Sequence, residues 1–149
     1  YMAEHSPIRE KLFDIYIEDI PYCIANHIVR HHQGLEKYVT TSRSDRTDIK
    51  DRSQRSQMDL VSMGMTVNAQ ALINMSKVRL CYCADKDARK VMFEIVRQIK
   101  EIEPELGSKL VPSCVYRNFC SENNKNCGYS KEFLRKWREE YIGGREQLL

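Results

Sequence analysis

Hydrophobic and polar residues alternate along positions 12–18 of the chain. Phe13, Ile15 and Ile17 fall on one side of this alternation, and polar or amphipathic side chains separate them. A period of two in β-branched and aromatic residues is typical of a β-strand, because successive side chains of a strand point to opposite faces. The pattern therefore predicts a strand over positions 12–18.

Helical spacing of apolar residues follows in the next segments. Pro21 suits the first position of a helix, and residues 22–31 predict a helix with Ile24 and Ile28 on one side. From Asp59 to about Leu80 apolar residues again recur at helical intervals, which predicts a second helix. The apolar positions of that segment are Leu60, Met63, Val67, Ala71, Met75 and Val78.

Two further helices are predicted in the second half of the chain. Asp85 or Asp87 can cap a helix that Pro104 stops, and Ser130 can cap the last one. Residues 33–57 are mostly polar and predict loop, and residues 112–129 predict an irregular, cysteine-rich segment. The apolar stripes of these two helices are Val91, Met92, Ile95, Val96, Ile99 and Ile102, and then Phe133, Leu134, Trp137 and Tyr141. The whole pattern is that of an α+β protein dominated by helices.

Composition narrows the class of protein. With 149 residues, 42% hydrophobic and 30% charged, the chain predicts one globular domain, residues 1–149, with a real core. No apolar run is long enough for a membrane span, and no secretory signal is visible, so we expect a cytoplasmic protein. A net charge of +3 does not by itself indicate nucleic acid. The chain begins with Tyr1, so a missing N-terminal segment is left open.

The segment 43–55 is dense in charge and nearly free of apolar side chains. One interpretation is a solvated loop. The other is a mobile loop whose arginines close on phosphate, because guanidinium pairs with phosphate oxygens in a forked geometry.

Two groups of polar residues are candidates for ligand contacts. Arg30, His31 and His32 follow one another at the predicted end of a helix, where basic residues also serve simply to balance the helix dipole. Asn68 and Asn74 precede Arg79 in the second predicted helix, where asparagine is mildly unfavourable. Both groups suit an anionic, planar ligand, although a buried asparagine often only ties a helix to a neighbouring backbone.

Both groups resemble motifs of the flavin-dependent thymidylate synthases. Arg30-His31-His32, followed by Thr40-Thr41-Ser42-Arg43, resembles the Arg-His-Arg triplet and Ser-x-Arg loop of that family. The spacing of Asn68, Asn74 and Arg79 matches the family's Asn/Asn/Arg helix more closely, and the resemblance covers roughly residues 4–103. The chain departs from the family at His32, where arginine is usual, and at His27, where glutamine is common.

The resemblance implies the family's fold, an α+β arrangement with a small antiparallel sheet, and its chemistry. Family members use reduced FAD, with NADPH and methylenetetrahydrofolate as co-substrates, to methylate dUMP at carbon 5, and they form homotetramers with shared sites. It implies FAD or folate contacts for Arg30, His31, His32, Asn68, Asn74 and His5. It implies contacts with dUMP or a related pyrimidine nucleotide for His27, Ser42, Arg43, Arg52 and Arg79, with catalytic roles for Arg79 and Ser42.

The cysteines form a separate group. Cys81 and Cys83 follow Arg79, and Cys114, Cys120 and Cys127 lie in the irregular segment, which we assign with the rest of residues 112–149 to a cysteine-containing C-terminal extension. Zinc is normally held by four thiolates or imidazoles that include a compact Cys-x2–4-Cys pair, and neither spacing is of that kind. Free thiols and a structural zinc site are therefore both open, and disulfides are disfavoured in a reducing compartment.

Three functional hypotheses remain. The leading one is an enzyme similar to flavin-dependent thymidylate synthases. The second is a diverged flavin- or pyrimidine-nucleotide-binding homologue with altered or lost catalysis, which the changed triplet motivates. The third is a metal-stabilised nucleic-acid-binding module, which ranks low because the sequence lacks a compact cysteine knuckle and exposed aromatic residues interleaved with the basic ones.

Overall fold

A computed structural model of the chain describes residues 1–40, 51–123 and 126–143. The chain divides into two compact units. The sheet unit is Arg9–Ala71, and the helical unit is Tyr1–Ile8 together with the chain from Leu72 onward. The predicted α+β class with a small antiparallel sheet is confirmed.

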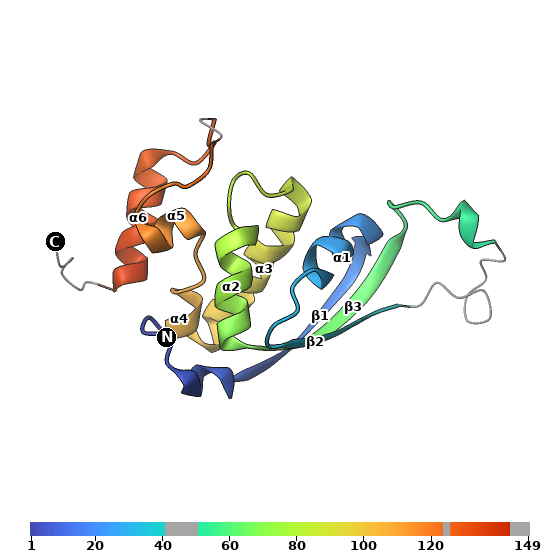
Figure 1. Ribbon diagram of the computed structural model, residues 1–149, viewed down its shortest axis with the longest axis horizontal. Helices are drawn as coiled ribbons and strands as arrows, with labels where there is room; N and C mark the ends of the chain where they lie inside the picture. Colours follow the sequence, from blue (N-terminus) through green and yellow to red (C-terminus); the bar gives the residue numbers. More distant parts are fainter. Residues whose placement is uncertain (41–50, 124–125, 144–149) are drawn as a thin grey trace. The chain divides into compact units, whose positions relative to one another are not determined.

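The sheet unit is built on three antiparallel strands in the order β1-β3-β2 (Figure 1). Its elements are a 3₁₀ turn over Ser6–Arg9, shared with the helical unit, then β1 (Leu12–Pro21), α1 (Tyr22–Val29), β2 (Leu35–Val39), the 3₁₀ turn Arg52–Gln54 and β3 (Leu60–Asn68). Val67 of β3 lies between Phe13 of β1 and Leu35 of β2, and all three side chains are buried. The buried faces of the strands therefore form the core of this unit.

Helix α1 packs against β1 and β3 through Ile24, Ala25 and Ile28. No side chain caps its first turn. Instead, the backbone N–H of Tyr22 donates to the carbonyl of Asp59, at 2.9 Å, and the helix is thereby tied to the chain that leads into β3. Backbone carbonyls satisfy N–H groups that would otherwise lack a partner at a helix start.

The helical unit contains α2 (Ala69–Arg79, whose first three residues belong to the sheet unit), α3 (Lys86–Ile102), α4 (Pro104–Gly107), α5 (Ser113–Arg117) and α6 (Lys131–Ile142). The predicted caps are confirmed, because the side chain of Asp85 accepts from the N–H groups of Asp87 and Ala88, and that of Ser130 accepts from the N–H of Phe133. These bonds fix where α3 and α6 begin.

The aromatic residues of α6 pack against α3, as the helical spacing predicts. Trp137 is stacked with Phe93 at a centroid distance of 5.8 Å and meets Phe133 edge-on at 5.1 Å. Such pairs add stability beyond the apolar area that they bury. None of the helices in the described part of the chain is long and apolar enough to cross a bilayer.

Three predictions of secondary structure are wrong, and the simplest case is the segment 112–129, which was expected to be irregular but contains helix α5. The helix expected from Asp59 to about Leu80 is a strand as far as Asn68 and a helix only from Ala69. The buried apolar side chains of β3 alternate, as a strand's period of two requires: they are Val61, Met63, Met65 and Val67. The apolar residues chosen at helical spacing came partly from β3 and partly from α2. The polar segment expected to be loop contains β2, which pairs with the edge of β3.

Candidate functional site

Arg30 closes helix α1, as predicted for the basic triplet. It is the C-cap residue, with helical φ and ψ of −69° and −14°, and the N–H of His31 donates to the carbonyl of Ile28 at 3.1 Å. The Arg30 side chain is exposed, and within the described residues no partner holds its guanidinium. This cation is therefore available to a ligand.

Lys37 of β2 holds the rest of the triplet in place. Its ammonium group donates to the carbonyl of His31 and lies 3.3 Å from Nδ1 of His32. An ammonium group can only donate, so this contact uses the lone pair on Nδ1 and leaves the ring proton of His32 on Nε2. The exposed His32 ring thus presents an N–H donor. Sequence reasoning missed Lys37, although its place in a short segment with Leu35, Tyr38 and Val39 was a usable signal for a strand.

Asn68 joins the triplet loop to the start of α2. Its backbone N–H donates to the carbonyl of Gly34 at 2.9 Å, and its side-chain Oδ1 accepts from the N–H of Ala71 at 2.8 Å. Gly34 has a φ of +72°, and a Cβ at this position would lie only 2.6 Å from Nδ2 of Asn68. The absence of a side chain at Gly34 therefore lets the loop approach the asparagine amide.

The structure thus brings the triplet, Lys37, Gly34 and Asn68 together within the sheet unit. We call this group the triplet corner. Its exposed or half-buried polar groups are a guanidinium, an ammonium, imidazole N–H donors and an amide. Such a set suits an anionic, planar, hydrogen-bonding ligand, because charge-assisted bonds to these donors are about twice as strong as neutral ones. His27, half-buried on the last turn of α1, belongs to the same unit.

The other candidate ligand-binding residues belong to the helical unit. His5 is exposed ahead of the first 3₁₀ turn, Asn74 is exposed in the middle of α2, and Arg79 is half-buried at its last residue. The sequence placed Asn68 and Asn74 in one helix, but the structure does not. Asn68 is the last residue of β3 and caps α2, whereas Asn74 lies on the exposed side of α2.

Part of the predicted substrate site lies outside the described residues. Ser42 and Arg43 fall in positions 41–50, and only the backbone of Arg52, at the start of the second 3₁₀ turn, is described. The neighbouring Arg55 has its Nε 3.8 Å from a carboxylate oxygen of Asp59. Asp59 therefore shares this arginine with any anion that approaches it.

All six cysteines are free thiols. Burial raises the pKa of the Cys81 thiol. A hydrogen bond from the backbone N–H of Cys83 to this sulfur lowers the pKa, but by less. Burial also raises the pKa of Cys114, and the thiols of Cys120 and Cys81 add to that effect. As the side chains stand, no three His, Cys, Asp or Glu residues of the described ranges are close enough to share a metal ion.

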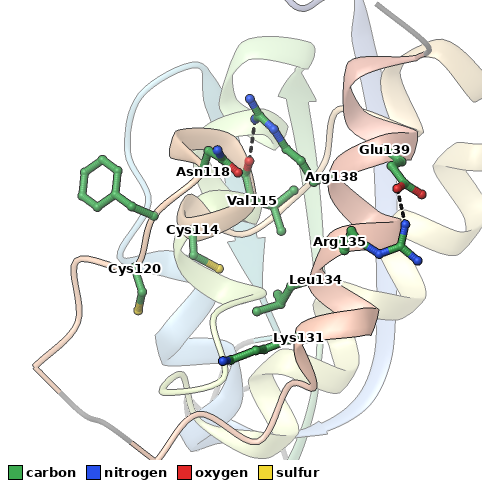
Figure 2. A pocket seen from close by; sticks show the side chains of 10 residues that line it. Cys114, Val115, Asn118, Cys120, Lys131, Leu134, Arg135, Arg138 and Glu139 are labelled. Carbon is green, nitrogen blue, oxygen red and sulfur yellow. Dashed lines mark hydrogen bonds and ion pairs between the residues drawn. The ribbon is translucent and has the colours of Figure 1, made fainter. Parts of the chain in front are cut away.

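Two hollows lie in the helical unit, and neither was foreseen from the sequence. One, of about 380 Å³, lies between α5, the chain that follows it and α6 (Figure 2). The other, of about 430 Å³, lies between α3 and α6 and is lined mainly by Phe93, Phe133 and Trp137 with basic residues around them. The first hollow is lined by Cys114, Val115, Asn118, Phe119, Cys120, Lys131, Leu134, Arg135, Arg138 and Glu139.

Comparison with known proteins agrees with the resemblance seen in the motifs. Residues 60–105 match the family model described as thymidylate synthase complementing protein. This segment runs from β3 through α3 and contains Asn68, Asn74 and Arg79, so the better preserved of the two motifs lies inside it.

Three curated relatives are each named flavin-dependent thymidylate synthase. The Clostridium tetani protein is 34% identical over 67 residues, which is 45% of this chain and 26% of the relative. The Geobacter sulfurreducens protein is 31% identical over 78 residues, 52% of this chain and 33% of the relative. The Saccharolobus solfataricus protein is 26% identical over 82 residues, 54% of this chain and 31% of the relative. The chain thus spans about a third or less of the length of the relatives it matches, and no solved structure matches it.

Proposed function

We propose that the chain is a diverged relative of the flavin-dependent thymidylate synthases that it resembles, and that it binds FAD and a uracil nucleotide and takes part in reductive methylation of dUMP at carbon 5. NADPH and methylenetetrahydrofolate would be the co-substrates. The homotetramer typical of this family would complete the site with residues of neighbouring chains.

The triplet corner fits the flavin. FAD supplies hydride chemistry when bound, and the protein's part is to orient the ring and to stabilise charge on its polar edge. Arg30 offers an exposed guanidinium for that edge, and His32 offers an N–H donor. The amide of Asn68, which can lie against the loop because Gly34 has no side chain, would add a further donor to this edge. His31 and His5 complete the proposed set of FAD or folate contacts.

The substrate would be held by basic and hydroxyl groups. We assign Arg79 and Ser42 to the reacting end of the nucleotide, and Arg43 and Arg52 to its phosphate, because guanidinium pairs with phosphate in a forked geometry. His27 and Asn74 would add hydrogen bonds to the base and the flavin. The observation that carries the proposal is the position of Asn68, which belongs to the matched segment and also contacts the loop of the basic triplet.

The first test is binding of FAD by the purified full chain, measured by its visible absorbance and by fluorescence titration. We expect Arg30→Ala to weaken FAD binding roughly 10- to 100-fold, since a hydrogen bond to a charged group contributes about 1.5–3 kcal/mol. Arg9→Ala is the matched control, because Arg9 is another exposed arginine of the sheet unit. Equal effects of the two substitutions, or no FAD binding by the wild type after reconstitution, would refute the proposal.

The second test addresses catalysis. We expect dUMP-dependent oxidation of NADPH, with formation of dTMP when methylenetetrahydrofolate is present. Arg79→Ala should lower kcat/KM roughly 100-fold or more, by loss of a charged contact to the nucleotide. Arg117→Ala, an exposed arginine at the last residue of α5, should leave kcat/KM unchanged.

One observation favours a second function. His32 stands where arginine is usual, and its Nδ1 faces Lys37, so the corner carries an imidazole in place of a guanidinium. This change suits a homologue that binds flavin and pyrimidine nucleotide but has altered or lost catalysis. Tight binding of FAD and dUMP without any oxidation of NADPH would select this alternative, and His32→Arg would then be the variant in which to look for recovered activity.

A further inference from the structure

The connection between α5 and α6 is unusual because little of it is buried. From Asn118 to Ser130 the described residues form no helix or strand, and all are exposed except Tyr129, which is half-buried. Surface loops are commonly exposed in this way, but one that carries several cysteines can be fixed by a metal ion that they bind together. Three of the chain's six cysteines, Cys114, Cys120 and Cys127, lie in or directly before this connection.

The second half of the connection is attached to the turn that follows α2. The hydroxyl of Tyr129 donates to the carbonyl of Leu80 at 2.8 Å, and its ring meets that of Tyr82 edge-on at 5.4 Å. Gly128 lies so close to Tyr82 that a Cβ would come within 2.1 Å of the ring. Residues 128 and 129 therefore lie against residues 80–82, which brings the neighbouring Cys127 to the same part of the helical unit as Cys81.

The first half of the connection brings the other two cysteines to the same region. Cys114 on α5 and Cys120 line one hollow, as Figure 2 shows. Burial is the main cause of the raised pKa of Cys114, and the thiols of Cys120, Cys81 and Cys127 each raise it further. Three thiols that are separated from Cys114 along the sequence are thus near enough to act on it electrostatically.

We propose that Cys81, Cys114, Cys120 and Cys127 bind one zinc ion through four thiolates. Zinc favours tetrahedral coordination by cysteine sulfur at about 2.3 Å, and structural zinc sites use all four positions for protein ligands. As the side chains stand, the four sulfurs do not yet surround a common point, so they must converge on the ion as it binds. Each thiol loses its proton to solvent as its bond to zinc forms.

The surroundings fit thiolates. The backbone N–H of Cys83 donates to the sulfur of Cys81, and that of Val115 donates to the sulfur of Cys114. Such bonds favour the charged form of a thiol. Four thiolates and Zn²⁺ carry a net charge of about −2, and Lys131 and Arg135 line the hollow beside Cys114 and Cys120. The exposed Cys83 assists through its backbone, and Cys23 belongs to the sheet unit.

The choice of four cysteines is tested by zinc content after purification of the full chain from zinc-supplemented medium. We expect about one zinc per chain by elemental analysis, with loss of at least 80% of it in each of the variants Cys81→Ser, Cys114→Ser, Cys120→Ser and Cys127→Ser. Cys83→Ser and Cys23→Ser are the matched controls and should keep the full amount. A wild type that contains no zinc and takes up none, or a control that loses it, would overturn the assignment.

A second measurement on the wild type does not depend on the folding of variants. Replacement of zinc by Co²⁺ should give the visible bands of tetrahedral cobalt together with an intense near-ultraviolet sulfur-to-cobalt band. With the metal bound, two of the six thiols, Cys23 and Cys83, should react with a thiol reagent in the native state, and all six should react after chelation. Six reactive thiols in the metal-loaded protein, or fewer than six after chelation because a disulfide has formed, would overturn the proposal. Neither readout requires FAD or dUMP, so the zinc site and the proposed enzymatic function can fail independently.

Discussion

The triplet corner and the connection between α5 and α6 are ordered in opposite ways. At the corner, the strand ladder, a helix cap and the buried core fix the backbone and the side chain of Asn68. In the connection, Tyr129 is the one described residue from Asn118 to Ser130 that is partly shielded from solvent, and its hydrogen bond to Leu80 is a local attachment. A ligand site can rely on the corner as it stands, whereas the connection needs an added cross-link to be equally well defined.

This contrast shows where each kind of chemistry is to be sought. Donors that must be aligned before a ligand arrives are found where backbone bonds already fix them, because preorganised groups lose little entropy on binding. A structural metal such as zinc stabilises the folded state by its own binding free energy. It is therefore expected where few apolar side chains are buried and the chain is otherwise weakly stabilised.

Removal of the proposed zinc should have the largest effect on stability. We expect chelation to lower the stability of the helical unit by more than about 2 kcal/mol, because binding energy at a structural metal site is also folding energy. By calorimetry the melting temperature should fall by at least roughly 5 °C. The ellipticity of the sheet and the binding of FAD at the triplet corner should change much less, and a uniform loss of both would contradict the contrast between the two regions.

Substitution of Gly34 should have the next largest effect. Gly34→Ala places a side chain at a φ of +72° and drives its Cβ into the Asn68 amide, so we expect a loss of roughly 2–3 kcal/mol in the free energy of unfolding. Gly143→Ala is the control, because Gly143 has a similar φ of +62° but open space around it, with its nearest contact at 3.8 Å. That control should lose only about 1 kcal/mol. Equal losses in denaturant titrations would mean that the close approach to Asn68 is unimportant.

Substitution of Asn68 separates structure from ligand binding at the corner. Asn68→Ala removes the cap of α2 and should cost about 1 kcal/mol of stability. Asn68→Asp keeps an acceptor for the Ala71 N–H, so its melting temperature should stay near that of the wild type. Its affinity for FAD should nevertheless fall, since an amide donor is replaced by a negative charge. An unchanged FAD affinity in Asn68→Asp would limit the role of Asn68 to the helix cap.

The smallest effect is expected at Tyr141 and only at high pH. Burial raises the pKa of the Tyr141 phenol, with smaller contributions in the same direction from Tyr116 and Glu4, while Arg138 opposes them. The Lys109 ammonium lies over its ring at 5.3 Å. A raised pKa means that the unfolded chain loses its phenolic proton first, so stability present below about pH 10 is lost as the pH rises further. Tyr141→Phe should flatten this fall in stability between about pH 10 and 12, and Tyr38→Phe, at an exposed tyrosine, should not.

Local patterns were sufficient to predict much of the fold. β1, the helix ending at Arg30 and the caps at Asp85 and Ser130 follow from alternation, spacing and hydrogen-bonding side chains close in sequence. The strand β3 was missed because its apolar residues fit both periods, and only pairing with β1 and β2 decides between them. Such pairing joins residues far apart in the sequence, so it is invisible to a local pattern.

The candidate site was predictable to a similar extent. The triplet was correctly placed at a helix end, and Asn68 was singled out by its motif, but its role as cap of α2 was not predicted. Lys37 was missed because its partners, the His31 carbonyl and His32, become neighbours only when β2 pairs with β3. Long-range geometry of this kind also brings Cys81 and Cys127 together, a proximity that their spacing in the sequence does not indicate.

The bond between Asn68 and the Ala71 amide gives the corner a built-in reporter. The same asparagine touches Gly34, so a molecule that settles on the basic loop and stiffens it will also steady the first turn of α2. Exchange of the Ala71 amide hydrogen with deuterated solvent should therefore slow when the loop is occupied. That single proton offers a way to screen unlabelled compounds against the corner without any assay of turnover.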